Sequence, residues 1–549
     1  MLPLVIFAIT LFGILVRPFG FRIWVYSSIG AVATLALGLV ELRDLGFIFL
    51  LIWDSALTLI ALIVISYALQ SLGFFEWLIF WVLKICAVKY PVKKAKSNAD
   101  FKISHAKSQK FSTDSTPQSH ESSSISYDCH DLAASNLAMT KNANSKIFDE
   151  IVLGRESTNE THLGVRCNEA DLSSSAISQK GEFATINTRK AFILLTLCCA
   201  ITSAVLANDG AILIFTPLVL GLFLRARNAT NPQIIAFLFA TAFMCDISSN
   251  PLIISNLTNI ITANFYHIGF GDFARTMLLP NAFAVLGAIA LFLAVFRTPL
   301  SVPLLFRAPL KPKLSNKLFA LHCACICVFV ASFFLSTHFG LPLSVNCGIY
   351  AGILLFVLWR KSHSKAKSTL KNAPFGIIVF VFGLFVVVFA LTKGEFGLAF
   401  KVFLSGLTHD KVSSIFGVSA TSAIGASIFN NLPMVLFGNL TIHGMFAPFP
   451  FAYYFGTPAD FLGFASLDAF VDKDIKQNLV YAHLLGCNIG SKLTPIGSLC
   501  TLLWLSLIAK SSLLSQRGIN FGFWRYCKYA LIFTPFTLLF ACFGLWLGI

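Results

Sequence analysis

A series of long apolar runs constrains the fold of this chain more than any other feature. Charged residues make up only 12% of its 549 residues, and twelve runs reach or approach the length of a membrane span. A segment in lipid must satisfy its backbone polar groups internally, so each run is predicted to be helical. We therefore predict an all-α polytopic membrane protein, whose first run is a span rather than a cleaved signal peptide. The runs are 2–16, 22–40, 45–70, 191–224, 233–263, 276–297, 316–336, 340–359, 373–392, 412–442, 478–509 and 526–547.

Two stretches between the runs differ from them. Residues 71–88 are amphipathic and rich in Trp, which predicts a helix lying at the membrane interface. Residues 89–190 are polar, rich in Ser and without sustained periodicity, so we predict a largely disordered insertion. The insertion opens with the basic cluster KYPVKKAKS, which indicates the cytoplasmic face and contact with anionic membrane lipid.

Four of the runs carry a polar interruption. Two of them are too long for one helix and are predicted to be re-entrant hairpins, with tips at 208–210 and 430–433. Two others are predicted to be discontinuous helices, broken at 246–251 and 488–495. Proline cannot continue a helix interior without cost. The prolines expected to shape these interruptions are Pro217, Pro251, Pro433 and Pro495.

The same order of segments occurs twice. Three spans, an amphipathic stretch, a hairpin, a broken helix and a final span fill 1–297, and the same series fills 316–549. The loop 298–315 joins them. Each half would cross the membrane five times, and an odd number gives the halves opposite orientations. The pattern predicts an inverted-repeat transporter with about ten spans, two hairpins and a site at the midplane.

The loop charges orient this arrangement. Outside the insertion, the loops on one side carry 18 Lys or Arg residues and no Asp or Glu. Those on the other side carry seven basic and nine acidic residues. Because cytoplasmic loops are enriched in Lys and Arg, the first side and the insertion are predicted to be cytoplasmic and both termini external. The basic excess is then a topology signal, and no nucleic-acid partner is expected.

Apart from basic residues at the ends of runs, four Asp, Glu, Lys or Arg residues lie inside the predicted spans and breaks: Asp54, Asp209, Asp246 and Lys492. An unpaired charge at the bilayer centre costs about 2.5–3.5 kcal/mol or more. We expect a carboxylate to pair with Lys492 and Asp209 or Asp246 to exchange a proton during transport; a purely structural ion pair is the alternative. Asp54 is a third proton-coupling candidate, which could instead cap a neighbouring helix.

Neutral polar residues gather at the predicted tips and breaks. Amide and hydroxyl groups of this kind suit a small uncharged hydroxylated solute or a cation, and one basic residue is too few for a polyanion. The alternative is that they only cap the half-helices. The candidate solute-binding residues are Asn208, Asn430, Asn431, Ser255, Asn256, Thr494 and Ser498.

The 14 cysteines predict neither a disulfide framework nor a structural zinc site, since none form a CxxC pair and many lie in apolar runs. No other metal site and no cofactor are expected. Cys323, Cys325 and Cys327 are interpreted as packing residues rather than as ligands of a soft metalloid. Cys245 and Cys487 each precede the polar residue that opens a break. We expect packing there too, with a thiol contribution to the site as the alternative.

The motifs at the tips and breaks resemble the ArsB-type arsenite efflux permeases of the ion-transporter superfamily. The match covers both halves in order and nearly everything but the insertion. The family usually reads Gly-Pro-Lys where this chain has Gly490-Ser491-Lys492. The matching stretches are IWDSALTLIALIVISYALQSLGFFEW (52–77), LANDGAILIFTPLVLG (206–221), CDISSNPLIISNLTNI (245–260), IFNNLPMVLFGNLTI (428–442) and GCNIGSKLTPIGSLCTLLWL (486–505).

The resemblance implies a secondary transporter, not an enzyme, in the bacterial inner membrane. It implies export of arsenite, the neutral hydroxide As(OH)3, and of antimonite, in exchange for protons, which confers arsenical resistance. Some members work with a separate soluble ATPase that drives them with ATP. The resemblance places the translocation site at Asn208, Asp209, Asp246, Asn430, Asn431, Thr494 and Pro495.

Three other readings stay open at this point. A sodium/proton antiporter of the same superfamily would share the hairpins and the membrane carboxylates. A membrane scaffold or receptor would have no use for costly midplane charges and breaks. A dicarboxylate–sodium symporter would use repeated Ser-Asn-Thr tips, which this chain lacks.

Overall fold

The computed structural model describes residues 1–88, 183–307, 314–446 and 473–549. Apart from Val88, these residues belong to one compact unit. Most of the predicted insertion 89–190 lies outside them. Its last residues differ from the prediction, because Phe183–Ile186 forms strand β2 and helix α8 already begins at Thr188.

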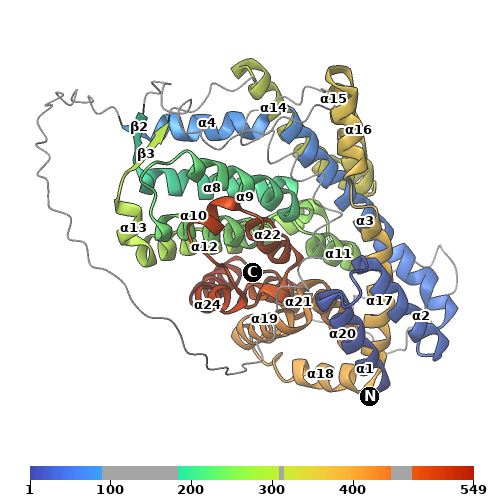
Figure 1. The fold of residues 1–549 in the computed structure, drawn as a ribbon. Coiled ribbons are helices and arrows are strands. Elements are labelled where there is room, and N and C mark those ends of the chain that lie inside the picture. The colour runs from blue at the N-terminus through green and yellow to red at the C-terminus, as the bar shows by residue number, and fades with distance from the viewer. Residues whose placement is uncertain (89–182, 308–313, 447–472) are drawn as a thin grey trace, which may run out of the picture. The chain divides into compact units, whose positions relative to one another are not determined.

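The described elements are nearly all helices (Figure 1). In the first half they are α1 (Leu2–Val16), α2 (Ile23–Ala36), α3 (Leu42–Ser71), α4 (Phe74–Cys86), β1 (Ala87–Val88), β2 (Phe183–Ile186), α8 (Thr188–Leu206), α9 (Asn208–Leu224), α10 (Asn231–Ile247), η2 (Ile253–Ser255), α11 (Leu257–Tyr266), α12 (Phe270–Val295), α13 (Arg297–Ser301) and β3 (Leu304–Arg307).

The second half presents a similar series. Its elements are α14 (Asn316–His338), α15 (Leu343–Lys361), α16 (His363–Lys371), α17 (Gly376–Lys393), α18 (Glu395–Ser405), η3 (Ser413–Gly417), α19 (Val418–Phe429), α20 (Asn431–Phe446), α21 (Lys473–Gly490), η7 (Ser491–Leu493), η8 (Pro495–Gly497), α22 (Leu499–Ala509), α23 (Ser512–Gln516) and α24 (Phe523–Gly548).

Seven helical stretches among the described residues are long and apolar enough to cross a membrane. Shorter apolar helices accompany them, namely Leu2–Val16, Ile23–Ala36, Asn208–Leu224, Asn231–Ile247, Ser413–Phe429 and Leu499–Ala509. These findings confirm the all-α polytopic class. The count of ten spans stays a prediction. The seven stretches are Leu42–Ser71, Thr188–Leu206, Phe270–Val295, Asn316–Ser336, Leu343–Lys361, His363–Lys393 and Phe523–Gly548.

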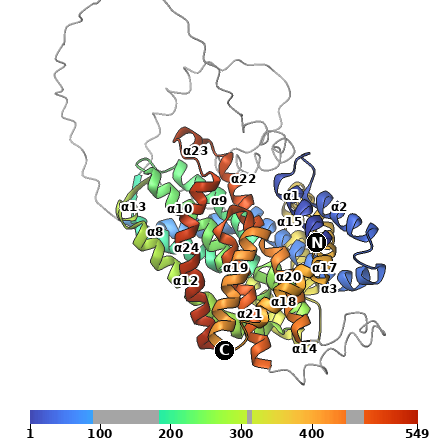
Figure 2. The same cartoon turned by 90° about the horizontal axis from the view of Figure 1, so that it is seen from below.

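Helix packing links the two halves of the chain. Helix α2 packs along α17, α3 packs along α15, and α12 packs along α24 (Figures 1 and 2). The α2–α17 contact is close, because a Cβ added at Gly383 would lie 2.7 Å from the backbone oxygen of Ser27. Small residues at such crossings let helix backbones approach each other in a membrane.

A small β-ribbon lies beside the helices. Strand β2 pairs antiparallel with β3, from Phe183 opposite Arg307 to Ile186 opposite Leu304. Ala226 adds an isolated bridge to Phe306. The ribbon therefore connects the segment that leads into α8 with the segment that follows α13.

Two tight turns interrupt the predicted hairpin runs where the sequence places them. Ala207, between α8 and α9, has φ 67° and ψ 146°. Asn430, between α19 and α20, has φ 76° and ψ 151°. Positive φ is uncommon for residues other than Gly and is often found at functional sites. The prediction for Pro217 was wrong, because this residue lies inside α9 rather than at the turn.

The two discontinuous helices are also broken as the sequence predicts. Helix α10 ends at Ile247, and α11 begins after an irregular stretch that contains η2. Helix α21 ends at Gly490, and α22 begins after η7 and η8. The N-cap residues of the second parts, Asn256 and Ser498, are both extended, with φ/ψ of −149°/144° and −139°/133°.

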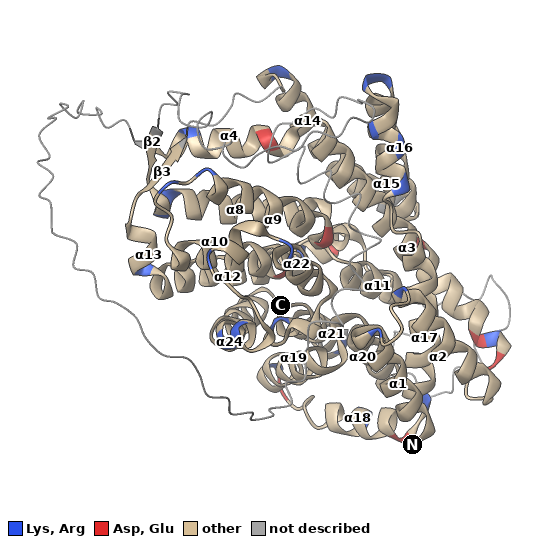
Figure 3. Cartoon of the chain, viewed as in Figure 1, with Lys and Arg blue, Asp and Glu red and all other residues tan. Residues whose placement is uncertain are grey.

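Charged residues are sparse over the helices. Most of the ribbon in Figure 3 is tan, and blue residues gather at the start of α14 and along α15 and α16. The last turn of α15 carries Arg360 and Lys361, and α16 carries Lys365, Lys367 and Lys371. Lys and Arg thus concentrate at helix ends and connections, which suits helices surrounded by lipid.

Candidate functional site

A buried ion pair joins the two broken helices. Asp246 lies in the last turn of α10, and its carboxylate contacts the ammonium group of Lys492 in η7. Both residues are 0% exposed. The ammonium also donates to the hydroxyl of Thr501 in α22. A buried charge is tolerated only when it is paired and hydrogen-bonded, and this pair meets that condition. The two residues are 246 positions apart in the sequence.

The carboxylate of Asp246 receives two further hydrogen bonds. The Nδ2 of Asn208, the first residue of α9, donates to Oδ1 at 2.7 Å. The Oγ of Ser498, the N-cap residue of α22, donates to Oδ2 at 2.8 Å. The first hairpin tip, the first break and both sides of the second break therefore meet at one carboxylate. Charge-assisted bonds of this kind are short and strong, and they fix the geometry of the site.

A neutral network forms a second link between the broken helices. Asn488 in α21 donates from Nδ2 to the Oδ1 of Asn250 at 2.9 Å and to the Oδ1 of Asn259 at 2.8 Å. The hydroxyl of Thr258 donates to the Oδ1 of Asn488 at 2.6 Å. All four residues are at most 1% exposed. The carboxamide of Asn488 thus has partners for its donors and its acceptor without contact with water.

Four residues of this network were not predicted as site residues: Asn250, Thr258, Asn259 and Asn488. Aligning the two breaks without gaps, 245–260 against 487–502, would have found Asn250 and Asn488, whereas Thr258 and Asn259 pair with Cys500 and Thr501, which carried no prediction. That alignment pairs Asp246 with Asn488 and Asn250 with Lys492. The Asp246–Lys492 ion pair and the Asn488–Asn250 hydrogen bond then join equivalent positions of the two breaks, the first between charged side chains and the second between neutral ones.

Other predicted residues tie each hairpin to the broken helix of its own half. The Oγ of Ser255 donates to the carbonyl oxygen of Ala204 in α8 at 2.5 Å. The Oγ1 of Thr494 donates to the carbonyl oxygen of Ser427 in α19 at 2.6 Å. The Nδ2 of Asn430 donates to the carbonyl oxygen of Ile496 at 2.8 Å. These bonds hold the hairpin tips against the breaks.

Two of the predicted site residues are asparagines at the starts of helices. Asn256 is the N-cap of α11: its Oδ1 accepts from the backbone N–H of Thr258 at 3.3 Å, and its Nδ2 donates to the Oγ of Ser249 at 3.2 Å. Asn431 is the first residue of α20, and its side chain is buried. Asn256 therefore performs the capping role that the sequence left as an alternative.

The remaining two carboxylates lie apart from the Asp246 hydrogen bonds. Asp209 is half-buried, and its backbone N–H donates to the Oδ1 of Asn208 at 2.9 Å. Asp54 in α3 accepts from the Nδ2 of Asn264 at 3.1 Å and from the backbone N–H of Ser344 at 2.9 Å. Ser344 lies in the first turn of α15, so Asp54 satisfies one of the free N–H groups there.

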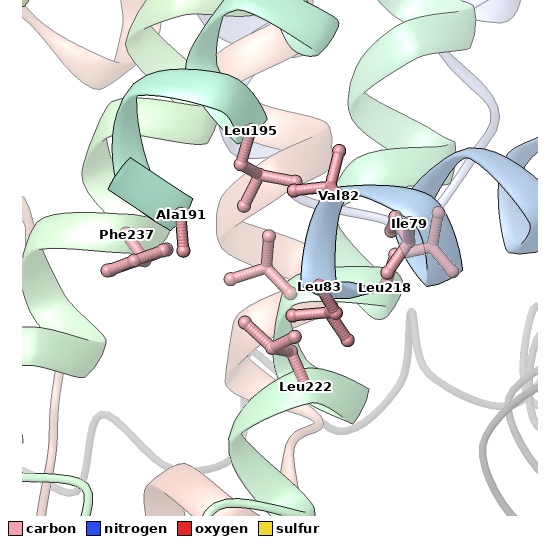
Figure 4. Close-up of a pocket in the computed structure, with 9 residues that line it drawn as sticks. Ile79, Val82, Leu83, Ala191, Leu195, Leu218, Leu222 and Phe237 are labelled. Carbon is pink, nitrogen blue, oxygen red and sulfur yellow. The ribbon is translucent and has the colours of Figure 1, made fainter. Parts of the chain in front are cut away.

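An apolar cavity lies between α4, α8, α9 and α10 (Figure 4). Only hydrocarbon side chains point into it, so it offers no hydrogen bond to a hydroxylated solute. The polar cluster around Asp246 and Lys492 is therefore the stronger candidate site. The cavity is lined by Ile79, Val82, Leu83, Ala191, Leu195, Leu218, Val219, Leu222 and Phe237.

The family model and two relatives that match this chain carry the same description. The family model ArsB, described as arsenical pump membrane protein, matches residues 2–96, 176–448 and 459–549. An arsenical pump membrane protein of Escherichia coli is 26% identical over 525 residues, 94% of this chain and 92% of the relative. One of Yersinia enterocolitica is 30% identical over 355 residues, 63% of this chain and 74% of the relative.

A more distant relative extends this similarity. A putative arsenical pump membrane protein of Bacillus subtilis is 23% identical over 381 residues, 65% of this chain and 79% of the relative. Both hairpin turns and both helix breaks fall inside the residues that the family model matches. The chain therefore belongs to the ArsB family of arsenical pump membrane proteins.

Proposed function

We propose that this protein is a secondary transporter that exports arsenite and antimonite from the cytoplasm and so confers arsenical resistance. One observation carries the proposal: in a chain of the arsenical pump family, a buried Asp246–Lys492 pair links the breaks of two discontinuous helices. Ionisable groups inside a membrane are costly and mark transport pathways. Breaks in membrane helices free backbone groups that can bind a solute.

The chemistry of the cluster suits a neutral hydroxylated solute. The carboxylate and the ammonium cancel each other's charge, and amides and hydroxyls surround them. As(OH)3 has O–H donors and oxygen acceptors that match such groups. A sodium/proton antiporter is less well supported, because sodium would have to displace the tethered ammonium of Lys492 from the carboxylate.

We further infer that the halves 1–297 and 316–549 are inverted repeats, joined by 298–315. Three observations support this. The main helices follow the same order, the tip residues Ala207 and Asn430 share one backbone conformation, and the second predicted span of each half packs along the third predicted span of the other. In this arrangement α8–α9 and α19–α20 are the re-entrant hairpins.

Proton exchange would use the same carboxylates. When Asp246 takes up a proton, its attraction to Lys492 is lost and the contact between the breaks loosens, which links protonation to opening of the site. Asp209, next to the tip, is the second candidate for the proton. Asp54 is the third, although its contacts favour capping of α15.

We place the protein in the bacterial inner membrane, with the insertion in the cytoplasm and both termini outside. The basic loops support this orientation through the positive-inside rule. Operation with a separate soluble ATPase is compatible with the proposal, and the carrier itself needs no cofactor.

The proposal is tested by arsenite uptake into everted membrane vesicles that contain this chain and no ATPase. Accumulation that requires a proton gradient and collapses with an uncoupler is the expected result. Asp246→Asn and Asp209→Asn should abolish or strongly reduce it, and Asp54→Asn should retain it. No accumulation, together with sodium-evoked loss of the proton gradient, would replace the proposal with the antiporter alternative.

A further inference from the structure

An exposed basic surface lies where α15 is followed by α16, on elements that take no part in the Asp246–Lys492 cluster (Figure 3). The last turn of α15 carries Arg360 and Lys361, and α16 carries Lys367 and Lys371. All four side chains are exposed. These four residues are called the α15–α16 basic surface below.

No acidic residue nearby in the sequence balances this surface. The chain has no Asp or Glu between Asp272 and Glu395. Within the part of the chain that the structure describes, none of the four basic residues forms an ion pair. Because like charges repel each other, a surface of this kind favours an anionic partner.

Helix α16 turns two of these lysines away from the protein. Its inner face carries Ala366 and Thr369, which are buried, and the helix packs on α3 and α15. Lys367 and Lys371 lie one turn apart on the opposite face, where Ser364 adds an exposed hydroxyl. Two like charges four residues apart destabilise a helix, and an anion bound between them removes that cost.

Two contacts fix the corner between α15 and α16. The ring of Trp359 lies edge-on to that of His363, with 4.5 Å between the ring centroids. The Oγ of Ser362, the N-cap residue of α16, accepts from the backbone N–H of Lys365 at 3.4 Å. The basic residues of both helices therefore belong to one structured surface.

The connections of α16 hold this surface at the depth of lipid headgroups. Helix α15 ends at Lys361 and α17 begins at Gly376, and both helices belong to stretches that are long and apolar enough to cross a membrane. Helix α16 has nine residues and a length of about 14 Å, so its lysines stay close to the ends of those two helices. The predicted orientation puts these ends on the cytoplasmic side.

Exposed apolar side chains flank the lysines. Trp359 is 46% exposed, Leu370 49% and Phe375 52%. Trp is typical of the membrane–water interface, where one end of a side chain meets hydrocarbon and the other meets headgroups. A phospholipid offers a partner to both kinds of side chain, whereas an acidic protein surface offers one only to the lysines.

We propose that the α15–α16 basic surface binds the phosphate headgroup of an anionic membrane phospholipid. The phosphodiester oxygens accept from the ammonium groups of Lys367 and Lys371 and from the hydroxyl of Ser364, and the two basic residues of α15 add to the positive field. The acyl chains lie against Trp359 and Phe375. This inference does not depend on the proposed function, because the surface lies outside the transport site.

The test counts the lipids bound to the purified full-length chain by native mass spectrometry. Delipidated protein in detergent receives equal amounts of phosphatidylglycerol and phosphatidylcholine with identical acyl chains. Wild type should prefer phosphatidylglycerol, and Lys367→Gln/Lys371→Gln should bind it at least about tenfold more weakly, since each Lys near an anionic surface contributes about fivefold in affinity. Lys367→Arg/Lys371→Arg keeps the charges and should bind as wild type does.

A matched control removes two exposed lysines from the other end of the chain. Lys510→Gln/Lys528→Gln changes the same number of charges on the same predicted side and should keep the preference. An equal loss in this control and in the α16 variant would overturn the proposal. Equal binding of the two lipids by wild type would also overturn it, and would leave an acidic protein as the partner of the lysines.

Two further measurements use wild type alone and do not depend on the folding of a variant. High salt should abolish the preference, because it screens exposed charges; a preference that survives it would refute the proposal. The free headgroup, glycerophosphoglycerol, should not compete with the lipid at equal concentration. Full competition would replace the membrane lipid with a soluble phosphodiester.

Discussion

The ion pair between Asp246 and Lys492 makes an asymmetric prediction about stability. Lys492→Met leaves the carboxylate buried with two donors, from Asn208 and Ser498. Asp246→Asn leaves the Lys492 ammonium buried. Besides the new amide, the described acceptor that remains for it is the hydroxyl of Thr501. We expect both single variants to be destabilised and Asp246→Asn to be affected more.

The size of each destabilisation depends on the free energy needed to neutralise the charge that is left without its partner. Protonating an ordinary carboxyl at pH 7 costs about 4 kcal/mol, and deprotonating an ordinary ammonium costs about 5 kcal/mol. These values limit the destabilisation, because the group neutralises once the penalty exceeds them. Removing one partner of a buried pair typically costs about 3–5 kcal/mol. The two remaining hydrogen bonds to Asp246 reduce its cost, so we expect about 2–4 kcal/mol for Lys492→Met and about 4–5 kcal/mol for Asp246→Asn.

The double variant Asp246→Asn/Lys492→Met removes both charges and tests the coupling. It should be more stable than Asp246→Asn alone, because no buried charge is left uncompensated. The assay is thermal unfolding of purified protein in detergent, followed by Trp fluorescence at pH 5, 7 and 9. The deficit of Lys492→Met should shrink towards pH 5, where protonating the carboxyl costs less. The deficit of Asp246→Asn should shrink towards pH 9. Additive single effects with no pH dependence would refute the buried pair.

Three further predictions concern local geometry. Gly438→Ala should destabilise the protein by about 1–3 kcal/mol, because its Cβ would lie 2.1 Å from a ring atom of His483; Gly444→Ala in the same helix, with no atom within 4 Å, should not lower the unfolding temperature. Ala207→Gly should raise the unfolding temperature, since Ala207 has φ 67° and Gly adopts positive φ without strain; a fall would contradict the strained turn. Asp54→Ala should lose about 1 kcal/mol of stability through the lost cap of α15, whereas Asp54→Asn, which keeps the acceptor, should stay near wild type; equal losses in the same melts would exclude the cap.

Much of the fold was predictable because, in lipid, the backbone N–H and C=O groups of a segment must form hydrogen bonds within that segment. Each apolar run must form its own helix, so the predicted spans and the two amphipathic stretches, 71–88 and 396–409, correspond to described helices, within a few residues at most ends. The interruptions were visible as polar residues inside these runs, and the turns lie at Ala207 and Asn430. The prediction that Pro217 shapes an interruption was wrong, because membrane helices accommodate a proline that breaks helices in water.

The candidate site was only partly predictable. The sequence singled out the few charges within the apolar runs, and the cost of burying them indicated that a carboxylate would pair with Lys492. From the sequence alone, Asp209 and Asp246 were equal candidates for pairing with Lys492, and Asn488 was not predicted as a site residue. Which carboxylate pairs depends on the angle at which the two breaks cross, and the network of Asn488 depends on contacts with residues more than 200 positions away.

The sequence by itself thus determined where helices form, where they are interrupted and which costly groups they carry, since hydropathy and backbone hydrogen bonding act within a segment. Only the tertiary structure decided that Asp246 pairs with Lys492, that Asp54 caps α15, and that Asn488 bonds with Asn250 and Asn259. These contacts join different helices, and their geometry follows from how the helices pack rather than from the pattern within any one of them.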